Sequence, residues 1–472
     1  MDNIPLLRAL REASDRSHAA FYTPGHKGGA GSPLRSWWGK NVLAADLPEL
    51  PELDNLFSPN GPIKEAQALA AMTFGAAETW FLTNGSTAGV IAAMLATCNP
   101  GDRIILPRNI HQSVVSGLIL SGALPVFVSP IYSPQWDLAL GVSPEAIAAA
   151  LKQAPDAKAI LVVSPTYYGT CSDLEAIAHI AHAQGVPLLV DEAHGAHFVA
   201  HPALPPTALE AGADVAVQST HKTLSSLTQS AMVHRQGDRV STSRLAQALQ
   251  LVQSTSPNYL LLASLDAARQ QLAAEGNALL SETLALSAMA RESLGQLPRL
   301  QILTPTAAAP FALDLTRLTV DVSGLGLTGF EADEWLHAQG VTAELPESRS
   351  LTFVLSLGNC AADIERLTIG FAQLVDKASS SKNIPVQVEL PLPTLGCSPR
   401  KAFFAEGEAV SASAAVGRIS KATISPYPPG IPALLPGEVI SAEILAHLRA
   451  IAASGGVITG CDDSLDRLIV VR

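Results

Sequence analysis

From about residue 60 to residue 217, short apolar runs alternate with stretches in which apolar residues recur at helical spacing. Residues 86–97, for example, place Val90, Ile91 and Met94 on one face of a helix. This alternation predicts an α/β fold with a mostly parallel sheet covered by helices on both faces. Ligands bind such sheets at the carboxyl ends of the strands. Strands are predicted over 103–106, 125–128, 159–163, 187–190 and 215–217, and further helices over 144–151 and 174–183.

The rest of the chain is less regular and predicts smaller units. A strand is expected over 352–357 and a helix over 364–375, followed by Ala378-Ser-Ser-Ser-Lys382, which is typical of a flexible linker. The four prolines of Pro426-Tyr-Pro-Pro-Gly-Ile-Pro432 predict a loop. A chain of 472 residues has room for two or three packed domains. We predict an N-terminal arm (1–60), a large domain (61–295), a smaller α+β domain (296–385) and a C-terminal α+β domain (386–472).

Composition and charge exclude several classes of protein. Hydrophobic residues make up 48% of the chain and charged residues 15%, which argues against disorder. The net charge of −12, without a basic run, argues against binding to nucleic acid. An uncharged stretch over 113–132 is interrupted by Gly117, Gly122 and Pro125, which indicates a helix followed by a strand and not a membrane span.

The cysteines and the N-terminus favour a cytoplasmic protein. The first 21 residues are charged and helix-like, without the apolar core of a signal peptide. The histidines form no HExxH motif, and no metal site is predicted. The five cysteines are scattered, odd in number and without a CxxC pair, which predicts reduced thiols at Cys98, Cys171, Cys360, Cys397 and Cys461.

Two ionisable residues follow predicted buried strands. Lys222 closes Ser219-Thr-His-Lys222 after the strand at 215–217, where poor solvation lowers the pKa of its ammonium and makes it nucleophilic toward an aldehyde. Asp191 ends the strand at 187–190, where an acid can face the pyridine nitrogen of pyridoxal phosphate (PLP) and keep the ring an electron sink. The structural alternatives are a snorkelling surface lysine and a helix-capping or salt-bridged aspartate.

Two further segments fit the phosphate and the ring of the same cofactor. Asn84-Gly-Ser-Thr87 precedes a predicted helix, so its N–H groups and the helix dipole favour an anion, to which Ser86 and Thr87 add hydroxyls. His111 starts a helix and can stack on one ring face, while the small Ala193 leaves room on the other. Ordinary helix caps are the alternative in both places. Each signal is weak alone, but their order and placement together predict a PLP enzyme.

These segments resemble the bacterial-type ornithine/lysine/arginine decarboxylases, which are PLP enzymes of fold type I. The similarity covers roughly residues 20–470. It is carried by Tyr22-Thr-Pro-Gly-His-Lys27, Phe81-Leu-Thr-Asn-Gly-Ser-Thr87, Pro165-Thr-Tyr-Tyr-Gly169, Asp191-Glu-Ala-His194 and Ser219-Thr-His-Lys222, with Thr255-Ser-Pro257, Val416-Gly-Arg-Ile419 and Tyr427-Pro-Pro-Gly-Ile-Pro432.

The resemblance implies a role for each matching residue. Lys222 forms the Schiff base with PLP, Asp191 pairs with the pyridinium, and His194 lies near the ring hydroxyl or the substrate. Family members are dimers or larger, so a homodimer or tetramer is expected, without the N-terminal wing domain of longer members. Thr255 and Ser256 would then reach the phosphate region of the other subunit. The other implied cofactor-binding residues are Gly85, Ser86, Thr87, His111, Thr166, Ala193, Ser219 and His221.

The predicted function is decarboxylation of a basic L-amino acid, with arginine slightly favoured over lysine and ornithine. Protonation at Cα is assigned to Lys222 or His194. The distal cation of the substrate needs a carboxylate, and the position in the family pattern points to Glu344, for which a solvated strand-end acid is the alternative. The His26 loop is expected to border the site. The fallback acids are Glu438, Asp46 and Asp54.

Two other functions stay open at this point. One is another fold type I activity on an amino acid, such as transamination, in which Arg349 or Arg366 would hold the substrate carboxylate, or aldol cleavage. The other is a PLP-fold regulator that has lost its activity. An intact Lys222, Asp191 and phosphate segment argue against the regulator.

Overall fold

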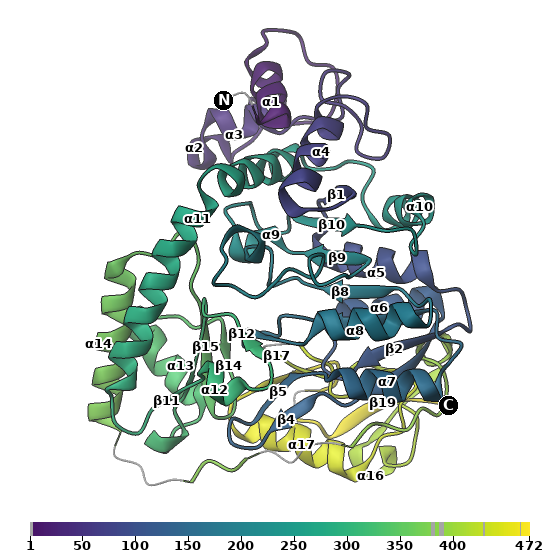
Figure 1. Cartoon of the computed structure of the whole chain (residues 1–472), viewed down its shortest axis with the longest axis vertical. Helices are drawn as coiled ribbons and strands as arrows, with labels where there is room; N and C mark the ends of the chain where they lie inside the picture. Colours follow the sequence, from purple (N-terminus) through teal and green to yellow (C-terminus); the bar gives the residue numbers. More distant parts are fainter. Residues whose placement is uncertain (1–2, 379–382, 387–390, 428–429, 463) are drawn as a thin grey trace.

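A seven-stranded sheet forms the centre of the molecule (Figure 1). The structure is a computed structural model that describes residues 3–378, 383–386, 391–427, 430–462 and 464–472. The strand order is β1-β10-β9-β8-β6-β2-β3, in which the strands from β9 to β3 run parallel and β10 is antiparallel to both β9 and β1. The strands are β1 (Glu78–Leu82), β2 (Arg103–Pro107), β3 (Leu124–Val128), β6 (Ala159–Val163), β8 (Leu188–Asp191), β9 (Val215–Gln218) and β10 (Ala231–Arg235).

The mostly parallel sheet and its five predicted strands are confirmed, but β1 and β10 were not predicted. Both strands carry polar residues that break the apolar pattern. In the folded chain these residues satisfy each other across the sheet: Thr79 Oγ1 lies 2.8 Å from His234 Nδ1, and His234 Nε2 lies 3.1 Å from Gln218 Oε1. Such cross-strand hydrogen bonds satisfy the polar atoms of a buried histidine. They cannot be predicted from the sequence of one strand alone.

Alternate residues of the strands face two different helical layers. Ile104, Leu161 and Val217 pack with α5 (Gly85–Thr97), α6 (Gln112–Ser121) and α10 (Thr242–Val252) on one face. Ile105 and Ile160 pack with α7 (Pro144–Gln153) and α8 (Leu174–Ala183) on the other. The predicted helices are present, and the uncharged stretch at 113–132 divides into α6 and β3 as expected. Among the described residues, no helix has the length and apolarity that crossing a membrane requires.

A long helix, α11 (Tyr259–Gly295), leads from the large sheet to a second, antiparallel sheet (Figure 1). The order of this sheet is β11-β13-β15-β14, and α13 (Gly329–Ala338) and α14 (Ala361–Lys377) pack with it in one apolar cluster. The predicted strand at 352–357 and helix at 364–375 correspond to β15 and α14. The strands are β11 (Gln301–Ile302), β13 (Arg317–Asp321), β14 (Leu345–Pro346) and β15 (Ser350–Val354).

The C-terminal part has its own apolar cluster around α17 (Ala442–Ala453). Two strand pairs belong to it, β16 (Gly407–Ser411) with β19 (Arg467–Val471) and β17 (Ser425–Tyr427) with β18 (Val457–Thr459). The loop predicted from Pro426 to Pro432 is therefore wrong at its start, because Pro426 pairs with Ile458 in a two-stranded ribbon, where a proline is tolerated. Pro428 and Pro429, like most of the linker predicted at 378–382, lie outside the described residues.

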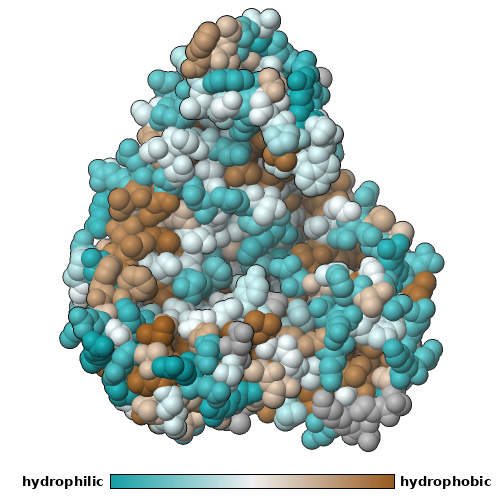
Figure 2. Space-filling view, turned by 180° about the vertical axis from the view of Figure 1, so that it is seen from behind, coloured by the Kyte–Doolittle hydropathy of each residue, from teal (hydrophilic) through white to brown (hydrophobic). Residues whose placement is uncertain are grey.

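The N-terminal segment forms the narrow upper end of the molecule in Figure 1. It contains α1 (Pro5–Asp15), α2 (Arg35–Trp38) and α3 (Lys40–Ala45), of which α1 packs against α11. Figure 2 shows the molecule from behind, with brown apolar side chains gathered in several patches among teal polar ones. The division into four segments, with boundaries near 60, 295 and 385, stays a prediction.

The close packing of α5 on the sheet can be tested by a substitution at Gly89. A Cβ atom at this position would lie 2.6 Å from Val217 Cγ1 and 2.7 Å from Val233 Cγ2. We expect Gly89→Val to overpack this contact, to cost about 1–3 kcal/mol of stability and to lower the midpoint of thermal unfolding. Gly358→Val is the matched control, because a Cβ there meets nothing within 4 Å. Equal midpoints for the two variants would contradict this account of the packing.

Candidate active site

Lys222 lies in a short helix, α9 (Thr220–Thr223), directly after β9. Its amine is 2.9 Å from His194 Nε2 and 5.8 Å from the centre of the Tyr167 ring. Burial lowers the pKa of Lys222, and the charge of Arg317 lowers it further, while the negative charges of Asp191 and Glu344 raise it. The amine is therefore less strongly protonated than that of an exposed lysine, which is what attack on an aldehyde requires.

Asp191 and His111 lie close enough to Lys222 for their charges to interact. Asp191 is buried at the end of β8, and Ala193 N donates to its Oδ1 over 3.2 Å. Burial raises the pKa of Asp191, whereas His111 and Lys222 lower it. His111 caps α6 by accepting from Ser113 N at Nδ1, so its neutral ring carries the proton on Nε2. The cap alternative thus holds for His111, which also faces the charge of Asp191.

The two predicted phosphate segments meet. The helix α5 begins at Gly85, which adopts a φ of +73°, and its first turn presents N–H groups without a partner inside the helix. Ser219 Oγ donates to Ser86 Oγ over 2.7 Å, so hydroxyls from two strand ends converge beside this turn, and Thr87 is exposed next to them. A helix N-terminus with convergent hydroxyls suits a phosphate.

His221 fits a phosphate less directly than the sequence suggested. Its Nδ1 lies 2.8 Å from the carbonyl oxygen of Ser230, to which it donates. Burial lowers the pKa of His221, and the neutral ring has no second N–H to offer. It would donate to a phosphate oxygen only when protonated.

The loop with Thr255 and Ser256 lies beside the same turn of its own chain. Ser254 N donates to Asn84 Oδ1 over 3.3 Å, and both Thr255 and Ser256 are exposed. The Thr166 hydroxyl is buried and lies 2.6 Å from Thr170 Oγ1, so it forms a hydrogen bond within its own loop. A role of these three residues in cofactor binding stays a prediction.

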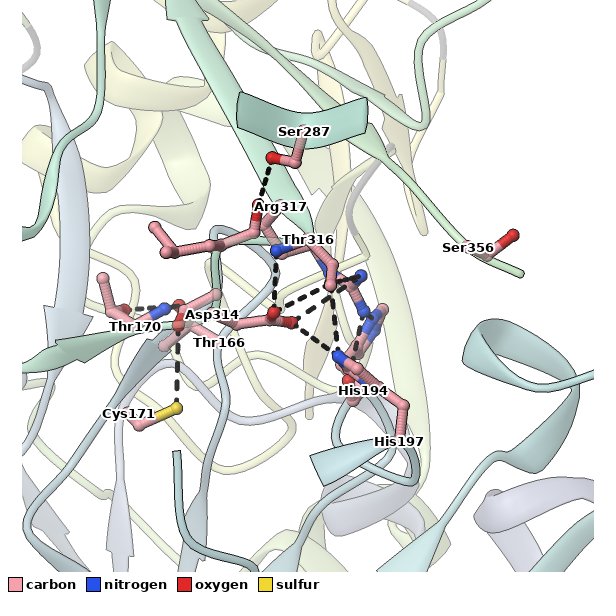
Figure 3. Close-up of polar contacts among 12 residues, drawn as sticks. Thr166, Thr170, Cys171, His194, His197, Ser287, Asp314, Thr316, Arg317 and Ser356 are labelled. Atoms are coloured by element: carbon pink, nitrogen blue, oxygen red, sulfur yellow. Dashed lines mark hydrogen bonds and ion pairs between the residues drawn. The ribbon is translucent and has the colours of Figure 1, made fainter. Parts of the chain in front are cut away.

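A buried ion network behind Lys222 holds His194 (Figure 3). Arg317, on β13, donates from Nη2 to the His194 carbonyl oxygen over 3.1 Å and approaches His194 Nδ1 at 3.4 Å. Because Arg317 can only donate, Nδ1 must accept, and the ring proton lies on Nε2, which faces the lysine. Burial and the charge of Lys222 hold the pKa of His194 well below its usual value, which keeps the ring neutral.

Asp314 balances the charge of Arg317 in this network. Its Oδ2 lies 3.1 Å from His197 Nε2 and 3.9 Å from Arg317 Nη1, and Thr316 donates to its Oδ1. Burial raises the pKa of Asp314, but these partners lower it to about 2. Removing the charge of an arginine from water is costly, and an ion-pair partner such as Asp314 offsets this cost.

Arg317 was not predicted from the sequence, and Tyr167 was predicted only as a member of a segment that resembles the family. Arg317 comes from the second sheet and reaches the site by tertiary packing, so no local pattern marks it. Arg349 and Arg366 were the two arginines considered for binding the substrate carboxylate in a transaminase. In the structure, Arg349 donates a hydrogen bond to Ser323 Oγ, and Arg366 is exposed on α14. Neither acts on the pKa of Lys222.

Glu344 is the acid of the four candidates whose charge reaches Lys222. It lies directly before β14, is exposed in the single chain, and raises the pKa of both Lys222 and His221. Its side chain is therefore near the amine and open to an incoming group. That it binds the substrate stays a prediction.

The fallback acids have structural partners instead. Asp54 accepts from the backbone N–H groups of Asn60, Gly61 and Ile63 and so caps α4 (Pro62–Phe74). Glu438 is fully buried and pairs with Arg108 at 3.1 Å. Folding therefore uses Asp54 as a cap and one oxygen of Glu438 as an ion-pair partner. A substrate-binding role for either acid stays a prediction. His26 and Asp46 bond each other at 3.0 Å in the N-terminal segment, and their place beside the active site stays a prediction.

Comparison with known proteins decides the family. A model of the major domain of Orn/Lys/Arg decarboxylases matches residues 4–312, and a model of the C-terminal domain of these enzymes matches residues 389–465. The chain belongs to the Orn/Lys/Arg decarboxylase family. It is therefore a decarboxylase of a basic amino acid, and the resemblance inferred from its motifs is confirmed.

Relatives of this decarboxylase are similar over almost their whole length. The arginine decarboxylase of Bacillus subtilis is 38% identical, with 99% of this chain and 97% of the relative covered, and that of Bacillus cereus is 40% identical over 92% and 96%. The constitutive lysine decarboxylase of Escherichia coli is 24% identical, with 94% of this chain and 76% of the relative covered.

Solved structures confirm the fold of the decarboxylase. The Francisella novicida lysine decarboxylase LdcF superposes with a TM-score of 0.87 at 23% identity, covering 100% of this chain and 82% of the other. A serine palmitoyltransferase of Sphingomonas wittichii shares 67% of the chain at a TM-score of 0.54. The fold is thus the predicted fold type I architecture.

The influence of Arg317 on the pKa of Lys222 can be tested by substitution. Arg317→Met removes a positive charge that disfavours the ammonium, so the pKa of Lys222 should rise. Reductive methylation of Lys222 by formaldehyde, followed by peptide mass spectrometry as a function of pH, should then begin at a higher pH than in the wild type. Arg317→Lys, which keeps the charge, should restore the wild-type profile, and the exposed Arg366→Met should leave it unchanged. An unshifted profile for Arg317→Met would contradict the assigned influence of Arg317.

Proposed function

We propose that this decarboxylase converts L-arginine to agmatine and CO2, using PLP bound through Lys222. The observation that carries the proposal is the partly buried Lys222 amine, which faces His194 and interacts with the charge of the buried Asp191. Support for arginine over lysine comes from the relatives named arginine decarboxylase, which align over nearly the whole chain.

The residues around Lys222 fit PLP. The turn before α5, with Ser86 and Ser219, offers donors for a phosphate, and Asp191 offers a carboxylate for the pyridine nitrogen. A protonated pyridine nitrogen would add a directly paired cation to the buried Asp191, beside the charges of His111 and Lys222 that already act on it. When bound, PLP supplies the electron sink for loss of the carboxylate.

The proton chemistry falls to Lys222. The neutral His194 ring carries its proton on Nε2 and donates a hydrogen bond to the lysine amine 2.9 Å away, which orients the amine. Because the pKa of His194 is held well below its usual value, the ring has no acidic proton to give, and Lys222 is the group that would deliver a proton to the substrate Cα after CO2 has left. The ring centre of Tyr167 lies 4.8 Å from that of His194 and packs against this histidine.

Glu344 is proposed to bind the guanidinium of arginine. A carboxylate accepts two parallel N–H bonds from a guanidinium, which distinguishes arginine from the point charge of lysine. The exposure of Glu344 in the single chain leaves it free for this role.

A homodimer or tetramer with shared active sites, in the cytoplasm, belongs to the same proposal. Thr255 and Ser256 are exposed beside the phosphate turn, where they could also reach a second subunit. The N-terminal segment that carries His26 exposes large aromatic side chains, with Phe21 96% and Trp37 81% accessible. Exposed apolar groups of this size are typical of a surface that another chain covers.

A substrate panel tests the reaction directly. Purified protein supplied with PLP and with arginine, lysine or ornithine should release CO2 fastest from arginine, with agmatine as the product. Lys222→Ala should reduce turnover by at least about a thousandfold, because the essential amine is gone. Keto-acid formation would indicate a transaminase instead, and no reaction with any amino acid, together with failure to take up PLP, would favour the regulator.

A second test concerns the specificity residue. Glu344→Gln removes the charge that faces the guanidinium, and we expect KM for arginine to rise about tenfold to a hundredfold, as for a lost charged hydrogen bond. Glu365→Gln, an exposed carboxylate on α14, is the matched control and should leave KM unchanged. Equal KM values for the two variants would remove Glu344 from the site.

A further inference from the structure

A cavity of about 440 Å³ lies where the large sheet region, the second sheet and the C-terminal part meet. Its walls come from the hairpin of β4 (Ile131–Ser133) and β5 (Leu138–Gly141), from the loop at 347–350 and from α17. None of the residues that line it is Lys222, His194, Asp191 or Glu344. The cavity is therefore separate from the proposed active site, and its size is that of a pocket for a small molecule.

Four side chains that line this cavity have buried polar atoms without a hydrogen-bond partner among the described residues. Two are carboxylate oxygens, Glu347 Oε2 and Glu438 Oε1, and two are donors, Trp136 Nε1 and Arg349 Nε. Glu438 is fully buried and Trp136 is 3% exposed, so bulk water does not satisfy them. Because buried polar groups are normally paired, such a cluster around one cavity indicates a missing partner.

The charges of the wall favour a cation. Four carboxylates line the cavity among the described residues, those of Asp137, Glu347, Glu438 and Glu443, against the guanidiniums of Arg108 and Arg349. Arg108 already pairs with Glu438. Burial raises the pKa of Glu347 to about 7, so a nearby cation would complete the ionisation of this acid.

Much of the remaining wall is apolar and suits an aliphatic chain. It includes Phe330, Leu392, Ile444 and Ile451. We propose that this cavity is a second binding site, which takes a small aliphatic cation with an amine or guanidinium group held by Glu347 and Glu438. If the proposed function holds, the substrate and the product both have this chemistry, so the site would sense one of them.

A direct structural link connects the cavity to the catalytic lysine. Glu347 Oε1 accepts from the Tyr168 hydroxyl over 2.6 Å. The neighbouring residue, Tyr167, packs edge-on against His194 and lies over Lys222. A cation at the unpaired Glu347 Oε2 would thus bind the same carboxylate that holds the Tyr168 hydroxyl, one residue away from the ring that contacts Lys222.

Equilibrium dialysis with radiolabelled agmatine on the PLP-loaded, full-length protein tests the site. Glu347→Gln removes one unpaired carboxylate, and Ala139→Phe fills the cavity from β5, where Ala139 lines its wall. Each variant should bind one agmatine fewer per chain than the wild type, and Glu365→Gln, outside the cavity, should bind the wild-type number. Unlabelled arginine and putrescine as competitors show whether the carboxylate or the guanidinium of the ligand matters.

The outcomes separate this inference from the proposed function. The same number of bound agmatine molecules in the wild type and in both cavity variants would overturn the second site, whatever the activity. A wild-type enzyme that releases no CO2 from arginine would overturn the proposed function, while the dialysis would still decide the cavity.

Discussion

The contact between the Lys222 amine and His194 Nε2 is the interaction on which the site depends. It places a basic amine in a poorly solvated position, where a charged form is costly, and it surrounds that amine with charges of both signs. Asp191 and Glu344 favour the ammonium, while Arg317 and burial oppose it. The amine thus remains basic enough to exchange a proton and is not locked as a cation.

The fold holds this balance with parts that are far apart in the sequence. The ends of β8 and β9 supply Asp191 and Lys222, and the helices that follow β1 and β2 begin with the phosphate turn and with His111 as its cap, respectively. The second sheet then contributes Arg317, which fixes the tautomer of His194 from behind. The long α11 joins the large sheet to the second one, and the network around Asp314 holds the two regions in contact at the site.

Much of this arrangement could be predicted from the sequence, because the strands of the parallel core are apolar runs and their ends carry the chemistry. The segment at 174–183 is an amphipathic stretch that forms α8 with the predicted bounds. The strands β1 and β10 were not predicted, because their polar residues find their partners only across the sheet, on each other and on Gln218 of β9. Arg317 was not predicted for the same reason: the role of this buried arginine follows only from its contacts with Asp314 and His194, which folding creates. The contacts of Asp54 and Glu438 could not be predicted, because the backbone donors and the guanidinium that bond to these acids are brought to them by folding.

The most direct test of the central claim is to locate the amine that holds PLP. The protein is loaded with PLP, reduced with borohydride and digested, and the modified peptide is identified by mass spectrometry. The account predicts a phosphopyridoxyl group on Lys222, at close to one per chain, and a loss of this modification when Asp191 is replaced by Ala. Stable modification at another lysine, with Lys222 unmodified, would contradict it.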